Sequence, residues 1–314
     1  MRAVVVTSFG GPEVLEARDA PDPVAGRDDL LVETEAIGVN YRDIYEREGR
    51  YGGEAPLVNG VEGAGRVVAG PHEGERVAWL AAPGSYAERV RVPVDRAVPI
   101  PDEISSETAA AVILQGATAH YLAKDVYPVG DGDDVLIHAA AGGVGLLLTQ
   151  IAKKLGARVI ATTSGGQKAE LARRAGADDV IGYDGFGARV RELTGGEGVA
   201  VAYDGVGQTT FDESLGSVRT RGTMVLFGAA SGPVPPFDPM RLEHEGSLFL
   251  TRPGLRNYTS EREELLGRAA DVFAWVVDGS LEVSIGARYP LAEARRAQED
   301  LAARRTTGKL LLLP

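Results

Sequence analysis

One stretch of this chain, from Asp134 to Gly145, constrains its fold more than any other. A run of apolar residues leads into a loop of alanine and glycine, and the segment that continues to Leu155 has apolar residues at helical spacing. A further run of strand-forming residues, Arg158–Thr163, follows at the distance that a β-α-β unit requires. The stretch therefore predicts a strand, a tight loop and a helix in succession.

The loop itself predicts a nucleotide site. Ala140, Gly142 and Gly145 stand where the three glycines of a dinucleotide-binding G-x-G-x-x-G loop stand. A loop without side chains lets the backbone approach a pyrophosphate, and the N–H groups at the start of the following helix bind that anion. We therefore expect a nicotinamide or flavin nucleotide to contact this loop, including Gly143 and Val144.

Composition limits the class of protein. The 314 residues suggest two domains, and there is no cysteine, which excludes a disulfide framework, a thiolate nucleophile and a cysteine-ligated zinc. The net charge of −12 disfavours nucleic acid as a partner. The N-terminus does not have the pattern of a signal peptide, and no apolar run has the length of a membrane span, so we expect a cytoplasmic protein.

The first hundred residues have the pattern of short strands separated by glycine- and proline-rich turns, which is typical of a compact β-barrel. The elements predicted there are strands at Val4–Thr7, Leu30–Val39, Gly63–Val68, Arg76–Ala78 and Ala87–Val92, and a short helix at Tyr41–Arg50.

After Ser105 the pattern changes to alternating helices and strands, beginning with an alanine-rich helix over Ala109–Leu122 that Gln115–Thr118 begins or interrupts. Alternation of this kind predicts an α/β fold with a doubly wound parallel sheet of the Rossmann type. Towards the C-terminus, Glu261–Asp278 predicts an amphipathic helix. The last predicted strands, which return to the first domain, are Val283–Tyr289 and Lys309–Leu313.

Several short motifs extend over nearly the whole chain, namely Gly38–Asp43, Gly60–Gly65, His138–Gly145, Phe227–Gly228, Thr251–Pro253 and Thr307–Lys309. In these motifs the chain resembles the medium-chain dehydrogenase/reductase superfamily, and within it the zinc-free NADPH:quinone oxidoreductase group that includes zeta-crystallin. The resemblance implies a Rossmann domain over 116–253, inserted into a GroES-like barrel domain made of 1–115 and 254–314. It also implies a homodimer and a nicotinamide cleft between the domains.

The chain differs from the zinc-dependent members of that superfamily. Those relatives carry cysteine where this chain has Asn40 and histidine where it has Val61. A catalytic zinc needs three convergent ligands, but the four histidines are scattered along the chain. We expect no metal and disfavour alcohol dehydrogenation, because no zinc ion would stabilise an alkoxide. His138 and Glu62 are expected to be structural, and Glu62 to need a cationic partner.

The second strand of the nucleotide-binding unit indicates which nicotinamide is used. An NAD site usually has Asp or Glu at the end of this strand, but here the strand ends in small residues that include Ser164, with Lys168 close behind. A carboxylate would repel a 2′-phosphate, whereas hydroxyls and a lysine would bind it. By resemblance, Lys168, Tyr183 and Arg304 contact the adenosine phosphate. We therefore predict NADPH.

The resemblance places Asn40, Tyr45 and Tyr51 beside the nicotinamide. Asn40 follows an apolar strand, where an amide needs a partner, and we expect it to hydrogen-bond the carboxamide or a carbonyl of the acceptor. The two tyrosines are expected to stack on a flat acceptor and to supply a phenolic proton. By the same resemblance, Thr118 lies near the nicotinamide ribose. Phe227, which closes the last Rossmann strand, and Thr251–Arg252 are expected to cover the nicotinamide.

The chemistry predicted is hydride transfer from NADPH to a quinone or a related flat acceptor. Hydride transfer requires position and dryness from the protein, because the cofactor carries the reaction. Two alternatives stay open. One is an NADPH-dependent reductase of enone or enal double bonds, and the other is a protein that binds NADPH without turnover.

Overall fold

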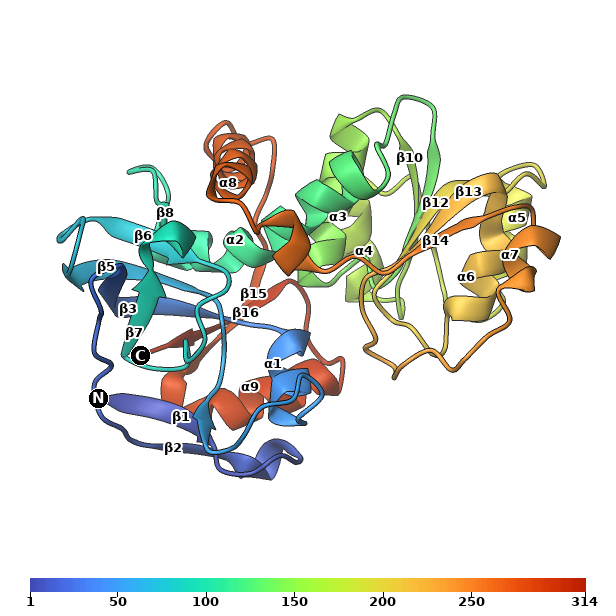
Figure 1. Ribbon diagram of the computed structural model, residues 1–314. Coiled ribbons are helices and arrows are strands. Elements are labelled where there is room, and N and C mark those ends of the chain that lie inside the picture. Colours follow the sequence, from blue (N-terminus) through green and yellow to red (C-terminus); the bar gives the residue numbers. More distant parts are fainter. The chain divides into compact units, whose positions relative to one another are not determined.

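The computed structural model describes residues Met1–Pro314, and the chain divides into two compact units. The barrel unit consists of Met1–Ala117 and Thr259–Pro314, and the Rossmann unit consists of Thr118–Tyr258. Figure 1 shows the two ends of the chain, blue and red, folded together in the barrel unit, with the green to orange middle forming the other. These borders lie within a few residues of the expected 115/116 and 253/254.

The barrel unit contains two sheets. The smaller has the order β2-β1-β4, and the larger has the order β15-β16-β3-β5-β6-β8, with β7 also paired to β3. Strand bounds are β1 Arg2–Val6, β2 Leu15–Asp19, β3 Asp29–Val39, β4 Leu57–Val58, β5 Gly63–Ala69, β6 Arg76–Trp79, β7 Arg89–Pro93, β8 Val98–Pro99, β15 Ile285–Pro290 and β16 Lys309–Leu313. The helices are α1 Tyr41–Arg47, α2 Ser106–Tyr121, whose last turn belongs to the other unit, α8 Arg262–Val277 and α9 Ala294–Ala302.

The last strand of the chain completes the first sheet. β16 runs antiparallel to β3, with Leu310 opposite Val39 and Leu312 opposite Ile37, and parallel to β15. These leucines are buried because they pack in the same apolar cluster as β1 and β3. The apolar C-terminus is therefore a core strand of the barrel unit, as its composition predicts.

The Rossmann unit has one six-stranded sheet of order β11-β10-β9-β12-β13-β14, in which all pairs are parallel. This is the order of a dinucleotide-binding doubly wound sheet, so the predicted fold class is confirmed. The strands are β9 Asp134–Ile137, β10 Arg158–Thr162, β11 Asp179–Ile181, β12 Val199–Asp204, β13 Val218–Leu226 and β14 Phe249–Thr251. The helices are α3 Gly143–Lys154, α4 Gln167–Arg174, α5 Phe186–Leu193, α6 Phe211–Ser217 and α7 Met240–His244.

The central strands of this sheet are buried on both faces, since Val135, Leu136 and Ile137 of β9 have no exposed surface and β12 is buried throughout. A parallel sheet covered by helices requires such continuous apolar strands. None of the helices in the structure combines the length and the apolar composition that crossing a lipid bilayer requires.

The structure corrects the sequence-based description in some elements. Gln115–Thr118 neither begins nor interrupts a helix, because α2 continues through it and ends in a π-helical turn at Leu122–Val126. Gly116 serves packing, since a Cβ there would lie 2.7 Å from a methyl group of Val272 in α8. The elements α7, α9 and β14 are not predicted from the sequence pattern. Short 3₁₀ turns occur at Pro12–Val14, Val94–Arg96, Leu255–Tyr258 and Leu291–Glu293.

Candidate functional site

The alanine–glycine loop connects β9 to α3, with Gly142 as the residue that caps the helix. A Cβ on Gly145 would lie 2.5 Å from the carbonyl oxygen of Ala139 and 2.7 Å from Cα of Ala140, so glycine is required there for the helix to approach the strand. A Cβ on Gly142 would meet only the Ala139 oxygen, at 3.2 Å. The space above Gly142 is therefore open on its outer side, where a ligand can approach the backbone.

The start of α3 offers N–H donors to that space. The first main-chain hydrogen bond of the helix is donated by Leu146 to the carbonyl of Gly142, at 3.0 Å. The N–H groups of Gly143, Val144 and Gly145 precede it and have no carbonyl one turn earlier in the helix. Free donors at the positive end of a helix dipole form an anion-binding site.

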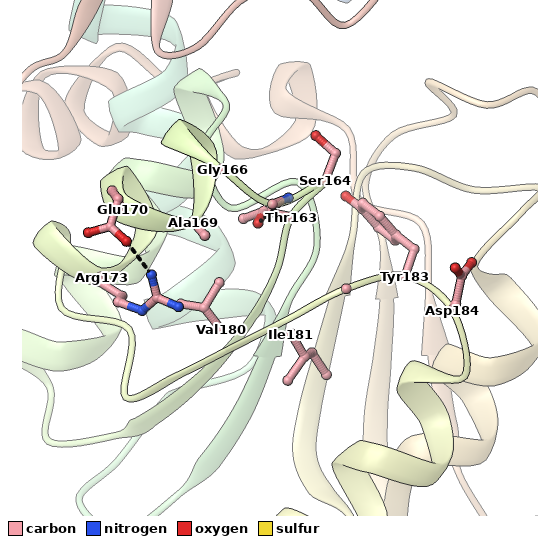
Figure 2. A pocket seen from close by; sticks show the side chains of 12 residues that line it. Thr163, Ser164, Gly166, Ala169, Glu170, Arg173, Val180, Ile181, Tyr183 and Asp184 are labelled. Carbon is pink, nitrogen blue, oxygen red and sulfur yellow. Dashed lines mark hydrogen bonds and ion pairs between the residues drawn. The ribbon is translucent and has the colours of Figure 1, made fainter.

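A pocket of about 580 Å³ lies next to this loop in the Rossmann unit, between the end of β10, helix α4 and the segment after β11. Its lining includes Thr163, Ser164, Gly165 and Gly166, which follow β10, and none of these four carries a charge. Figure 2 shows Ser164 and the hydroxyl of Tyr183 on the same side of the pocket. The end of β10 therefore lacks the carboxylate that would bind a free ribose.

The acidic residues that do line the pocket have other positions. Glu170 on α4 forms an ion pair with Arg173, at 2.6 Å, at the far end of the pocket from Ser164 (Figure 2). Asp184 lies at the exposed rim beyond Tyr183. A dianionic phosphate near Ser164 would therefore face hydroxyl groups.

Tyr183 connects this pocket to the glycine loop. Its phenolic oxygen accepts a hydrogen bond from the backbone N–H of Ala139, at 3.1 Å, and its ring stacks on His138 with centroids 6.2 Å apart. An oxygen that accepts from Ala139 keeps its own hydrogen for an acceptor in the pocket. Ala139 adopts a positive φ of 50°, and the tyrosine holds that residue in place.

Beneath the loop lies a chain of buried polar groups that sequence reasoning only partly found. His138 is 1% exposed, and its Nδ1 and Nε2 lie 2.8 Å from the hydroxyls of Thr162 and Ser214. Burial lowers the pKa of His138, which keeps the ring neutral. Ser214 lies 3.1 Å from Asp204, whose carboxylate also accepts two backbone N–H groups. His138 is therefore structural, as expected, and Asp204 could have been noticed only as an acid ending an apolar strand.

In the barrel unit, Asn40 is the N-terminal cap of α1, and its side chain is fully engaged. Its Nδ2 donates to Glu62, at 2.9 Å, and to the carbonyl of Gly38, at 3.2 Å. Its Oδ1 accepts from Gln115, at 2.6 Å, and from Lys309, at 3.0 Å. An amide has two hydrogens and two lone pairs, and all four are occupied here. A direct hydrogen bond from Asn40 to cofactor or acceptor, which stays a prediction, requires one of these bonds to break.

Asp43 and Tyr86 form a second buried pair that the sequence did not indicate. Both side chains have no exposed surface, and the phenol of Tyr86 donates to Oδ2 of Asp43, at 2.9 Å. The same Oδ2 accepts the backbone N–H of Asn40, at 2.8 Å, whereas Oδ1 has no hydrogen-bond partner. Burial raises the pKa of Asp43 to about 7, and it raises the pKa of Tyr86 further above its usual value.

Tyr45 and Tyr51 lie together, as the predicted stacking of both on one flat acceptor requires. Their ring centroids are 6.3 Å apart in an edge-on arrangement, and Tyr51 is 58% exposed. The guanidinium of Arg50 lies 4.8 Å from the ring centroid of Tyr45, and that of Arg42 lies 5.2 Å from that of Tyr51. The two rings therefore form a polarised, partly exposed aromatic surface.

Comparison with known proteins agrees with both units. Residues 26–102 match the alcohol dehydrogenase GroES-like domain, and residues 143–267 match the zinc-binding dehydrogenase family. A quinone oxidoreductase of Pseudomonas aeruginosa is 43% identical, and the alignment covers 100% of this chain and 99% of that protein. The chain belongs to the quinone oxidoreductase group of the medium-chain dehydrogenase/reductase superfamily.

Two further members of this superfamily are informative. The structure of a mycobacterial protein in complex with NADPH has a TM-score of 0.98 and 52% identity, and it covers 100% of both chains. A 2-haloacrylate reductase of a Burkholderia species is 38% identical over 99% of this chain and 98% of that enzyme. Full-length similarity therefore extends to enzymes that are named for different substrates.

This chain lacks the ligands that a zinc-binding dehydrogenase would need for its metal. The chain has no cysteine, and no group of three or more His, Asp or Glu residues gathers where it could hold a metal ion. Glu62, which follows Val61, is instead paired with the ammonium of Lys309. The residues present do not fit a catalytic zinc.

The remaining predicted residues fall in separate places. Thr118 is buried in α2, and Lys168 is half-buried in the first turn of α4. Phe227 follows β13 and packs on Gly205, where a Cβ would lie 2.9 Å from its ring. Arg304 lies in an exposed turn after α9, with a φ of 56°. Their contacts with a cofactor stay predictions.

Proposed function

We propose that this protein is an NADPH:quinone oxidoreductase. Its membership of the quinone oxidoreductase group supports the reaction, and the NADPH complex of its mycobacterial relative supports the cofactor. The observation that carries the proposal on this chain is the pocket after β10, which joins hydroxyl groups and the Tyr183 phenol to an open helix N-terminus. Together these offer donors to a pyrophosphate and to a 2′-phosphate.

In this proposal the Rossmann unit binds the cofactor. The backbone N–H groups of Gly143, Val144 and Gly145, which the helix already orients, are proposed to hold the pyrophosphate. Ala140 and Gly142, whose N–H groups donate to the carbonyls of Thr162 and Ala139, at 3.2 and 2.9 Å, are proposed to line it. The residues proposed for the 2′-phosphate are Ser164, Lys168 and Tyr183 of this unit and Arg304 of the barrel unit. Those proposed for the nicotinamide end are Thr118 and Phe227.

The barrel unit is proposed to receive the acceptor. Bound NADPH supplies a hydride, and the protein supplies orientation and the exclusion of water. Tyr45 and Tyr51 offer a flat surface on which a quinone ring can stack, and their phenols are the nearest proposed proton donors. Asn40 is proposed to belong to this site, and its saturated amide favours a role in holding the segment in place.

The experiment that tests the function is NADPH oxidation with a panel of acceptors under saturating cofactor. We expect turnover with simple quinones. The second candidate is reduction of an activated double bond, which the 2-haloacrylate reductase relative favours. Turnover of an enone or 2-haloacrylate without turnover of quinones would replace the first proposal, and binding of NADPH without oxidation by any acceptor would favour a non-catalytic role.

Zinc independence is part of the proposal, and it is supported by the donor set. Because the chain lacks cysteine and a cluster of metal-ligating side chains, dialysis against a chelator is expected to leave the rate of NADPH oxidation unchanged. Loss of activity on dialysis, restored by zinc, would contradict this.

A homodimer is also proposed, and the edge of the Rossmann sheet supports it. β14 is the last strand of the sheet and pairs only with β13, so its other edge is open to a second strand. Phe249 on this strand is 63% exposed. An exposed strand edge with an aromatic residue favours pairing with another chain. Sedimentation is expected to show a dimer, and Phe249→Asp a monomer; a monomeric parent protein would contradict the proposal.

A further inference from the structure

The barrel unit contains a buried lysine that the proposed reaction does not use. Lys309, the first residue of β16, is 2% exposed. Its ammonium forms an ion pair with Glu62, at 2.5 Å, and donates to Oδ1 of Asn40, at 3.0 Å. Burial lowers the pKa of Lys309, and the Glu62 carboxylate opposes that change. Lysine is rarely buried without such a partner.

Two glycines are required for this placement of the lysine, Gly38 beside its side chain and Gly308 beside its backbone. A Cβ on Gly38 would lie 2.1 Å from Oε2 of Glu62 and 2.8 Å from Cε of Lys309. Gly308, with a φ of 58°, would place a Cβ 2.3 Å from the carbonyl of Ser284, to which Lys309 donates its backbone N–H. The Thr307–Lys309 motif of the sequence therefore serves to place one ammonium group against Glu62 and Asn40.

The other contacts of the pair tie three parts of the chain together. Oε1 of Glu62 accepts the backbone N–H of Leu114 in α2, at 2.8 Å, and the neighbouring Gln115 donates to Asn40, at 2.6 Å. The Lys309 ammonium can only donate, so it must face the oxygen of the Asn40 amide. The Glu62 carboxylate can only accept, so it must face the nitrogen of that amide. The two charged groups thus fix the orientation of the Asn40 amide. Neutral groups that can both donate and accept would allow either orientation.

Because Asn40 is held in place, the residues that follow it in the chain are also held. Its backbone N–H bonds to Asp43, at 2.8 Å, in the first turn of α1, and α1 carries Tyr45. The backbone N–H of Arg50 in turn donates to the carbonyl of Tyr45, at 2.9 Å, immediately before Tyr51. The ion pair is therefore connected to both tyrosines through one short helix.

We propose that Lys309, paired with Glu62, is a positioning residue that fixes Asn40 and the start of α1 and thereby sets the arrangement of Tyr45 and Tyr51. A buried ion pair contributes little net stability compared with apolar residues of the same volume, so its value lies in the geometry it imposes. Its effect on turnover rests on the proposed quinone reductase function, whereas its effect on the segment does not.

The first test exchanges acid and amide without changing shape. Asn40→Asp alone places a second carboxylate against Glu62, and we expect quinone turnover to fall at least about tenfold. Adding Glu62→Gln restores the charge count and a hydrogen bond between positions 40 and 62, while Lys309 pairs with the new carboxylate. The Gly38 carbonyl stays without the donor that Asn40 supplied, so we expect part of the turnover to return. If Asn40 acted by bonding cofactor or acceptor with its amide, the second substitution would restore nothing, and that result overturns the proposal.

The second test needs no turnover. Glu62→Gln with Lys309→Met removes both charges, so no unpaired ion is left buried. We expect a melting temperature close to the parent value, but amide hydrogen exchange over residues 38–51 of the whole protein that is about tenfold faster or more. Binding of 2′,5′-ADP, whose proposed contacts lie in the Rossmann unit apart from Arg304, should be unchanged. Parent-like exchange in this segment overturns the proposal.

The two tests separate this inference from the proposed function. A parent protein that reduces no quinone refutes the function, and hydrogen exchange then still decides whether Lys309 holds the segment. A parent protein that reduces quinones, with variants that are equally active and equally protected, refutes the positioning role alone.

Discussion

The two units differ in whether their candidate functional polar groups are buried and bonded or exposed and open. In the barrel unit Asp43, Glu62 and Lys309 are at most 2% exposed and bonded to other protein groups. In the Rossmann unit Ser164 is exposed, and the donors of the candidate site are N–H groups at an open helix start. Groups that hold a segment in place are best buried and paired, whereas groups that bind a charged ligand must stay hydrated until it arrives. This difference is what the proposed function requires of a barrel unit that receives the acceptor and a Rossmann unit that binds the cofactor.

The largest effect is expected from displacing the start of α3, which carries the open N–H donors. Gly145→Ala places a methyl group 2.5 Å from the carbonyl oxygen of Ala139, which is backbone and cannot turn away. We expect NADPH binding to be lost and the free energy of unfolding to fall by about 1–3 kcal/mol. Fluorescence titration and urea unfolding measure both.

The matched control is Gly267→Ala in α8, where a Cβ would have no neighbour within 4 Å. It should bind NADPH like the parent protein and gain stability, because alanine favours a helix. Parent-like NADPH affinity in Gly145→Ala would mean that the loop does not hold the cofactor.

A charge reversal in the Rossmann unit tests the 2′-phosphate site. Lys168→Glu is expected to weaken NADPH by about 1–3 kcal/mol, because a charge-assisted hydrogen bond becomes a repulsion, and to change NADH binding much less. Lys154→Glu, an exposed lysine at the end of α3, controls for net charge. Dissociation constants for both cofactors decide, and an equal loss for NADPH and NADH would refute the assignment.

The buried carboxyl group of Asp43 in the barrel unit should make the stability of the protein depend on pH. The pKa of Asp43 is about 7 in the folded protein, well above the ordinary value of an aspartate. The folded state therefore retains a proton that the unfolded state loses near pH 4, so this contribution falls as pH rises towards 7. From pH 5 to pH 7 we expect a loss of roughly 1–3 kcal/mol.

The difference between the parent protein and Asp43→Asn isolates this contribution, because other titrating groups such as His138 cancel. Urea unfolding at several pH values measures it. A difference that is constant between pH 5 and 7 would show that Asp43 is not protonated in the folded protein.

The smallest effect concerns the exposed part of the barrel unit. Tyr51→Ala should raise the KM for a quinone several-fold, equivalent to about 0.5–1.5 kcal/mol of lost stacking, with NADPH affinity unchanged. Tyr51→Phe keeps the ring, so it should retain that KM and lower kcat only if the phenol supplies a proton. An unchanged KM in Tyr51→Ala would remove this tyrosine from the acceptor site.

Much of the fold could be predicted from the sequence, because helices and strands show in the spacing of neighbouring apolar residues. The β9 run, the glycine loop and α3 were predicted from neighbouring residues, and the alternation after residue 105 gave the parallel sheet. The short β14 and the helix α9 were not, because three residues give too little pattern and the buried face of α9 consists of Ala294, Ala297 and Gln298, which are not large apolar residues.

Family membership and the choice of NADPH also followed from short motifs and are confirmed by the relatives. Predicting the contacts of Asn40 was harder. The sequence indicates that this amide needs partners, but the structure alone shows that four protein groups already satisfy it.

By itself, the sequence determined the classes of element, the glycine loop, the absence of cysteine and the lack of an acid after β10, because each is a property of adjacent residues. Only the tertiary structure decided that Lys309 meets Glu62 and Asn40, which lie 247 and 269 residues away along the chain. The pairing of β16 with β3 brings them together, and no local pattern encodes the register of two strands so far apart.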